Sequence, residues 1–234
     1  MFTLDQVVPW GRSFDEYRRM FALGDDDLSS RMLGCGDGPA SFNAEATRRG
    51  TRVVSCDPLY RFDGEAIRGR IAMTADCVLA QTRLNEAQFV WRDIRSIEHL
   101  AAVRMQAMNR FLDDYGAGRS QGRYVAAELP ALPFADRAFD LAICSHLLFL
   151  YSMELGEALH AAALREMCRV AAEVRVFPLV SLSGDRSPFV DVNVETLEQE
   201  GFSVRLERVP YEFQRGADTM MRIVGSSHDR TDAR

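Results

Sequence analysis

The sequence lacks the long apolar stretches of a membrane protein. No apolar run reaches the roughly 18 residues that a membrane helix needs, and the longest, Leu141 to Tyr151, is interrupted by Ser145 and His146. The start of the chain lacks the apolar core of a signal peptide and carries acidic residues, among them Asp5 and Glu16. We therefore expect a cytoplasmic protein without a membrane segment.

Cysteine is scarce and irregularly placed. The five cysteines stand at positions 35, 56, 77, 144 and 168, and no two of them have CxxC spacing. No cysteine–histidine cluster has the spacing of zinc ligands either, so the sequence predicts no metal site. Cys35, Cys56 and Cys144 lie in apolar stretches, which is typical of buried, reduced thiols in a reducing compartment.

Positive charge is not in excess, since 28 Lys and Arg face 34 Asp and Glu and give a formal net charge of -6. A dedicated nucleic-acid-binding domain usually has a basic face, so we do not expect a nucleic-acid partner. A chain of 234 residues, 47% of them hydrophobic, suits one domain. We place this domain at residues 1–225, with a disordered tail at 226–234, and the sequence does not set its oligomeric state.

Short apolar strands alternate with amphipathic helices along most of the chain. Ser13 and Glu16 have the spacing of a capping box before a helix over residues 14–23. Further helices are expected over 39–49, with Pro39 at the first position, and over 152–171 and 194–200. Strands are expected over 31–33, 52–56, 124–127, 139–144, 174–179, 202–206 and 220–224. This alternation predicts an α/β fold: a Rossmann-like, mainly parallel, seven-stranded sheet with helices on both faces and an antiparallel closing hairpin.

Residues 61–123 differ from the rest of the chain. They are rich in Ala, Arg, Met, Gln and Glu, with one apolar stripe through Ile67 and Ile71 and another through Leu100 and Phe111. About 60 residues of helix is far more than the usual connection between two strands. We interpret this segment as a helical cap inserted between strands 2 and 3, with a flexible break over 116–122.

A glycine-rich turn follows the first strand. It consists of Gly34, Cys35, Gly36, Asp37 and Gly38. Glycines let the chain turn tightly and let a ligand approach the backbone, and the helix that follows offers free N–H groups to negative atoms. A plain strand-to-helix turn remains the alternative.

Two acidic residues follow the next strands. Asp57 ends the second strand, about 20 residues beyond the glycines, where a carboxylate can accept hydrogen bonds from two ribose hydroxyls. Glu128 ends the third strand and can accept from an adenine amino group, with the N–H of Leu129 donating to a ring nitrogen. The alternatives are a cap or turn role for Asp57 before Pro58, and a surface position for Glu128.

These features together resemble class I S-adenosyl-L-methionine (SAM)-dependent methyltransferases. The resemblance rests on the GxGxG turn, the acid that ends the second strand, and the acid four residues before Leu132-Pro133-Phe134. It covers roughly residues 30–60 and 124–225, and the whole chain is similar to a bacterial methyltransferase-like group without a defined substrate. The third glycine comes one residue earlier than in the NAD fingerprint GxGxxG.

The resemblance implies SAM as the cofactor and assigns roles to individual residues. Gly34, Gly36 and Gly38 would pack against its amino-acid end, Asp57 with Pro58 would hold the ribose, and Glu128 with Leu129 the adenine. One position departs from the family, which usually has an acid two residues before the first glycine, where this chain has Met32. Another group must then orient the ammonium of SAM, and Asp37 or a residue of segment 1–20 is the candidate.

The remaining candidates lie near the fourth strand and the N-terminus. Ser145 and His146 end the fourth strand, a position that faces the sulfonium in the family, and His146 or the nearby Tyr151 is a candidate base. Arg12 is a candidate for the carboxylate of SAM, because arginine binds carboxylates with two parallel hydrogen bonds. A structural histidine and a surface arginine are the alternatives. Tyr211, Glu212 and Gln214 in the closing hairpin are expected near the acceptor.

The sequence thus predicts a SAM-dependent methyltransferase with an unidentified acceptor, a small molecule or a chain end that fits beneath the cap. Three other functions stay open. These are transfer of the aminocarboxypropyl group of SAM, a non-catalytic module that binds SAM or a nucleotide, and a nucleotide-sugar or NAD enzyme on a similar sheet.

Overall fold

A single seven-stranded sheet organises the computed structural model, which describes residues 8–225. The strand order is β3-β2-β1-β4-β5-β7-β6. The strands are β1 Arg31–Cys35, β2 Arg52–Cys56, β3 Tyr124–Val125, β4 Phe139–Ser145, β5 Ala171–Phe177, β6 Ser203–Arg208 and β7 Thr219–Val224. The first five pair in parallel, and β7 pairs antiparallel with both β5 and β6. The predicted fold class, including the antiparallel closing hairpin, is confirmed.

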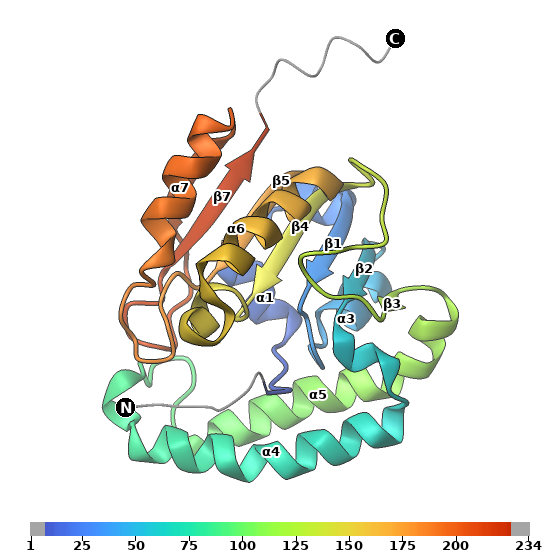
Figure 1. Ribbon diagram of the computed structural model, residues 1–234. Helices are drawn as coiled ribbons and strands as arrows, with labels where there is room; N and C mark the ends of the chain where they lie inside the picture. Colours follow the sequence, from blue (N-terminus) through green and yellow to red (C-terminus); the bar gives the residue numbers. More distant parts are fainter. Residues whose placement is uncertain (1–7, 226–234) are drawn as a thin grey trace.

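Helices cover both faces of this sheet (Figure 1). The α-helices are α1 Phe14–Met20, α2 Asp25–Ser29, α3 Phe42–Arg48, α4 Gly64–Leu84, α5 Ile97–Ser120, α6 Ser152–Val170 and α7 Phe189–Gln199, and short 3-10 turns are η1 Pro58–Arg61, η2 Glu86–Gln88 and η3 Phe149–Tyr151. Helices α6 and α7 lie on one face and α1 and α3 on the other. Among residues 8–225 no helix has the length and apolar character to cross a bilayer.

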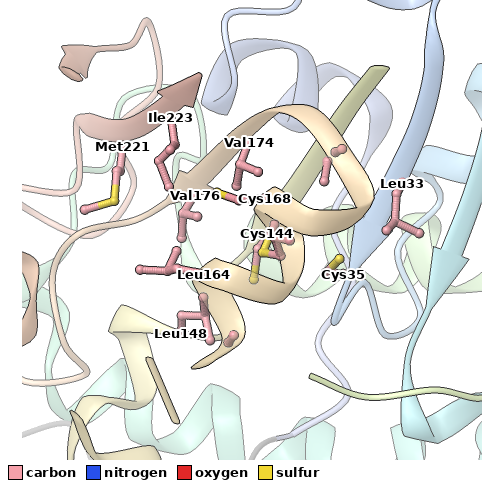
Figure 2. Close-up of a cluster of buried hydrophobic side chains, with 14 of the residues drawn as sticks. Leu33, Cys35, Cys144, Leu148, Leu164, Cys168, Val174, Val176, Met221 and Ile223 are labelled. Carbon is pink, nitrogen blue, oxygen red and sulfur yellow. The ribbon is translucent and has the colours of Figure 1, made fainter. Parts of the chain in front are cut away.

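The core consists of two layers, one on each side of the central strands. Figure 2 shows the layer between the sheet and α6, where Leu164 meets Val176 from β5 and Cys144 from β4. On the opposite face, Tyr17 of α1 stacks on Phe42 of α3 with ring centroids 4.7 Å apart. All five cysteines are free, and four of them are buried, which agrees with the thiols expected from the sequence.

Helices α4 and α5 form the predicted insertion and lie side by side across the carboxyl edge of the sheet (Figure 1). A third apolar cluster joins them to η1 and β3, and the hydroxyl of Tyr115 anchors it by donating to the carbonyls of Tyr60 and Phe62. These contacts hold the insertion against the strand ends, where the ligand-binding loops of such a sheet lie.

Several predicted bounds differ from the structure, since α7 begins at Phe189 rather than 194, β5 begins at Ala171 rather than 174, and β3 ends at Val125 rather than 127. Two further predictions are wrong for a visible reason. Helix α3 begins at Phe42 rather than Pro39, because Gly11 packs against the Pro39 carbonyl and Ser41 N donates to Arg12 O at 3.0 Å, which holds residues 38–41 in a turn. The predicted break over 116–122 is absent, since α5 continues to Ser120. At Gly118 a side chain would lie 2.4 Å from the Tyr124 ring, so this glycine allows β3 to pack closely against the helix.

Candidate functional site

The carboxyl ends of β1, β2 and β4 lie at one level, because Cys35 is in register with both Cys56 and Cys144. The loops that follow these strands border a cavity of about 600 Å³, which we call the large cavity. Its lining includes residues 8–10, Arg12, Tyr17, residues 36–39, residues 57–59, Arg61, Phe62, Ala66, residues 69–70, residues 73–74 and residues 145–147. The cavity has the size of a site for a nucleotide-like ligand.

The glycine turn is held tightly at the floor of the large cavity. Gly36 has φ +67°, and its N–H donates to the Cys56 carbonyl at 2.8 Å. A Cβ at this position would lie 2.5 Å from the side chain of Leu147, which also lines the cavity, so a residue larger than glycine would clash there. The Tyr60 hydroxyl donates to the carbonyl of Gly38 at 2.7 Å. The second half of the turn, residues 36–38, therefore borders the cavity.

Asp57 lies at the end of β2 and borders the large cavity. Its carboxylate accepts from the N–H groups of Gly38 at 2.8 Å and Leu59 at 2.7 Å, so it ties the glycine turn to η1 and also acts as the cap of η1. Burial, and to a smaller extent the charge of Glu128, raise its pKa to about 6. Two oxygens offer about four acceptor positions, so two remain for a ligand.

Asp37 is a buried acid of the same cavity. Its carboxylate accepts from the Tyr17 hydroxyl at 2.9 Å and the Ser55 hydroxyl at 2.5 Å. It folds beneath Gly34, where a Cβ would lie 1.8 Å from Asp37 Oδ2. Burial raises its pKa to about 6, opposed by these two hydrogen bonds. Met32, in contrast, lies wholly in the core beside α1 and cannot reach the cavity.

Other predicted cofactor residues lie at or outside the rim of the large cavity. Pro58 borders it, whereas Glu128 and Leu129 are not part of its lining. Glu128 is exposed and Leu129 packs against the core, although the charge of Glu128 is close enough to act on Asp57. The Cys35 side chain is buried in the core, so only its backbone belongs to the turn.

Residues 8–13, the N-terminal segment, pack beside the residues that follow the glycine turn, since Gly11 lies against the Pro39 carbonyl and Arg12 O accepts from Ser41 N. Arg12 borders the large cavity, and its Nη1 donates to the Trp10 carbonyl at 2.8 Å. Its Nε is buried and has no hydrogen-bond partner among residues 8–225. Burial and the nearby charge of Arg104 lower the pKa of Arg12. Arg12 is therefore a half-buried cation with a buried Nε at the cavity, and not the surface arginine that the sequence left as an alternative.

A second, smaller cavity of about 90 Å³ also borders this segment; we call it the small cavity. Its lining consists of Val8, Trp10, Arg12, Val78, Thr82, Phe89, Leu100, Arg104, His146, Leu150, Tyr151, Leu182, Phe213 and Gln214. Four of these residues, Val8, Trp10, Arg12 and His146, also line the large cavity, so the two spaces share one wall.

His146 stands at this shared wall. Its φ of +53° is unusual for a residue with a side chain, and its N–H donates to the Phe177 carbonyl at 2.7 Å. Nδ1 pairs with the hydroxyl of Ser145 at 2.8 Å. Burial, together with the charges of Arg12 and Arg104, holds the pKa of His146 well below its usual range. At neutral pH the ring is therefore uncharged.

Tyr151 lines the small cavity but not the large one. Its hydroxyl accepts from Val8 N at 3.4 Å, and burial raises its pKa. The phenol is therefore protonated at neutral pH and suits hydrogen-bond donation better than proton abstraction. In the closing hairpin, Gln214 lines the small cavity, whereas Glu212 accepts from Gly216 N and stays in the turn.

Sequence reasoning missed a buried ion pair behind the small cavity. Arg104 of α5 donates from Nη1 to both carboxylate oxygens of Glu16 at 2.7 Å, and the Tyr211 hydroxyl donates to Glu16 Oε1 at 2.9 Å. Burial opposes ionisation of Glu16, but the charge of Arg104 and the hydrogen bond from Ser13 outweigh it and lower its pKa to about 2. A signal existed, since Arg104 stands four residues from both Leu100 and Met108 in an otherwise apolar stripe.

No family model matches the chain. It is 30% identical over 221 residues to the uncharacterized protein MJ0045 of Methanocaldococcus jannaschii, and the match covers 94% of this chain and 97% of that protein. Two methyltransferase structures are similar to it at lower identity. Magnesium protoporphyrin IX methyltransferase (ChlM) from Synechocystis PCC 6803 with bound SAM has a TM-score of 0.47 and 13% identity, with 91% of each chain covered. Burkholderia thailandensis 1,6-didemethyltoxoflavin-N1-methyltransferase with bound 1,6-didemethyltoxoflavin and S-adenosylhomocysteine (SAH) has a TM-score of 0.44 and 13% identity, with 88% of this chain and 75% of that chain covered.

Proposed function

The chain belongs to the same family as MJ0045 of Methanocaldococcus jannaschii, and we propose that it is a SAM-dependent methyltransferase whose acceptor is a small molecule or a chain end. The observation that carries this proposal is the large cavity, which the glycine turn, Asp57 and Asp37 border together. One acid suits a ribose and the other an ammonium group, and bare backbone lies between them.

We propose a role in SAM binding for each predicted residue. Asp57, with Pro58 beside it, would accept from the ribose hydroxyls, and Glu128 with Leu129 would hold the adenine at the rim. Asp37 would bind the ammonium group in place of the acidic residue that the family usually has at the position of Met32. Its buried carboxylate is fixed by hydrogen bonds from Tyr17 and Ser55. Arg12 would pair with the carboxylate of SAM, because its side chain borders the large cavity and arginine binds carboxylates well.

Bound SAM supplies a methyl carbon already activated by a sulfonium, so the chain must mainly align the acceptor and exclude water. Neutral His146, fixed by Ser145, would accept the proton that a nitrogen or oxygen acceptor loses. Tyr151 would donate a hydrogen bond to the acceptor. Helices α4 and α5 of segment 61–123 would cover the acceptor as a cap, since both contribute residues to the small cavity. We also propose a cytoplasmic location, supported by the five free cysteines.

A comparison of ligands tests the donor assignment. We expect SAM and SAH to raise the melting temperature of the full chain and NAD to leave it unchanged, since binding to the folded state alone stabilises it. An NAD response equal to or larger than that of SAH would contradict the proposal. In turnover assays SAH should be the product, and methylthioadenosine would indicate aminocarboxypropyl transfer instead.

A further inference from the structure

Two residues that line the small cavity each have a buried guanidinium nitrogen with no hydrogen-bond partner among residues 8–225. Of the side-chain nitrogen and oxygen atoms of residues 8–225, only Arg12 Nε, Arg104 Nε and Gln88 Oε1 are buried and unpaired. Arg12 and Arg104 both line the small cavity, whereas Gln88 lines neither cavity. Buried donors in folded proteins are nearly always satisfied, so two unpaired N–H groups at one cavity point to a ligand that carries acceptor oxygens.

Positive charge exceeds negative charge around these two nitrogens. Arg12 forms no ion pair within residues 8–225, and the charged groups that act on it are Arg104 and Glu16. The Glu16 carboxylate already accepts from Ser13, Arg104 and Tyr211. The two positive charges of Arg12 and Arg104 are therefore balanced by only one nearby carboxylate, Glu16, which is already hydrogen-bonded. If SAM binds with its carboxylate on Arg12, it also brings a positively charged sulfonium to the shared wall. The net positive charge near Arg12 and Arg104 would therefore remain.

The rest of the small cavity is apolar. Its walls include the aromatic rings of Trp10, Phe89 and Phe213, with Leu100 and Leu150 beside them. The volume of about 90 Å³ is below the roughly 150 Å³ of a cavity that holds benzene. A ligand of that size would need more space than the small cavity has, and the large cavity, which shares four of its lining residues, is the adjacent space. The apolar walls therefore suit a ligand with an apolar body, and the two arginines suit a ligand with an anionic end.

We propose that the small cavity is the acceptor subsite and that it binds a small carboxylic acid with an apolar or aromatic body, its carboxylate held by the N–H groups of Arg104 and Arg12. The acceptor role rests on the methyltransferase proposed above, whereas the recognition of the carboxylate rests on the cavity itself. A neutral amide of the same shape would leave the guanidinium charge unmatched, and a site built for a polar group rejects an analogue that lacks it.

Calorimetric titration of the full chain tests this proposal, with and without saturating SAH. The probes are benzoate and phenylacetate, and benzamide and phenylacetamide are their neutral counterparts. We expect each carboxylate to bind at least tenfold more tightly than its amide. Equal affinities would overturn the proposal.

A charge-balanced variant assigns the effect to Arg104. Arg104→Met alone would strand Glu16, so we pair it with Glu16→Gln and expect the carboxylate preference to fall at least tenfold while SAH affinity is retained, because neither residue lines the large cavity. The matched control is Glu45→Gln with Arg110→Met, which removes another ion pair of α5, at 3.0 Å, away from both cavities. A preference that survives in the first double variant would overturn the proposal.

The two proposals fail in different ways. If SAH binds but the carboxylates do not outbind the amides, the acceptor class is wrong and the donor assignment stands. If SAH does not bind, the donor assignment is wrong and the acceptor role is lost with it. The titration without SAH then still shows whether the carboxylate site exists.

Discussion

The two cavities share a wall, yet they are built in different ways. The lining of the large cavity includes residues that directly follow strands, such as residues 36–38 of the glycine turn and Asp57. The small cavity gathers Trp10, Val78, Arg104 and Phe213 from four distant parts of the chain. A site made from strand ends can be identified from a motif, whereas a site made between inserted helices depends on how those helices pack.

The largest expected effect comes from breaking the ion pair between Arg104 and Glu16, behind the small cavity. Arg104→Met should lower the free energy of unfolding by about 3–5 kcal/mol, because it leaves the buried Glu16 without its counter-charge. Urea denaturation measures this loss. The double variant with Glu16→Gln removes both charges and should recover most of the stability. Equal losses in the single and double variants would show that packing, and not charge, explains the effect.

A smaller effect is expected in the large cavity, on binding rather than folding. Asp57→Ala should weaken SAM binding by about 1–3 kcal/mol, because the ribose hydroxyls lose their acceptor. Calorimetric titration measures the change. Asp63→Ala is the control, since Asp63 also caps a helix, accepting from Ala66 N at 2.8 Å, but lies outside the cavity. If Asp57→Ala and the control bind SAM equally, the ribose assignment is wrong.

The smallest effect is on the pH dependence of the ligand-free protein. Burial raises the pKa of Asp37 from its ordinary 3.8 to about 6, so its contribution to stability is fully present below about pH 4 and is lost as the pH rises through 6. The slope is at most about 1.4 kcal/mol per pH unit for one proton. Asp37→Asn should flatten this decline in melting temperature between pH 4 and 7.

The pKa of Glu16, behind the small cavity, shifts in the opposite direction to that of Asp37, at the large cavity, so their effects on stability fall in different pH ranges. Its pKa is lowered to about 2, so its contribution is present above its ordinary 4.5 and is lost only as the pH falls toward 2. The two titration windows therefore separate. If Asp37→Asn declines with pH as steeply as the wild type does, Asp37 is not the source of the slope.

Most of the fold could be predicted from the sequence, because each strand and helix has a local pattern. The capping box of Ser13 and Glu16 was identified correctly, since both partners lie within one turn. The ion pair between Glu16 and Arg104 could not be identified, because its partners stand 88 residues apart. The flexible break predicted from glycines was wrong because tertiary packing of Tyr124 against Gly118 outweighed glycine's low helix propensity.

The candidate site follows the same division. The glycine turn and Asp57 were found from spacing alone, and both border the large cavity. The buried state of Asp37, set by Tyr17 and Ser55, required knowledge of how α1 packs on β1 and β2. The small cavity had no motif, since its apolar walls look like ordinary core positions in the sequence.

The wall common to both cavities also has a thermodynamic consequence. Trp10, Arg12 and His146 contact whatever occupies either space, so a ligand on one side changes the surroundings of a ligand on the other. Linkage then requires symmetry: the factor by which the first molecule alters the affinity of the second equals the factor in the reverse direction. Order of addition can change the rates at which the ternary complex assembles, but its total free energy is the same by either route.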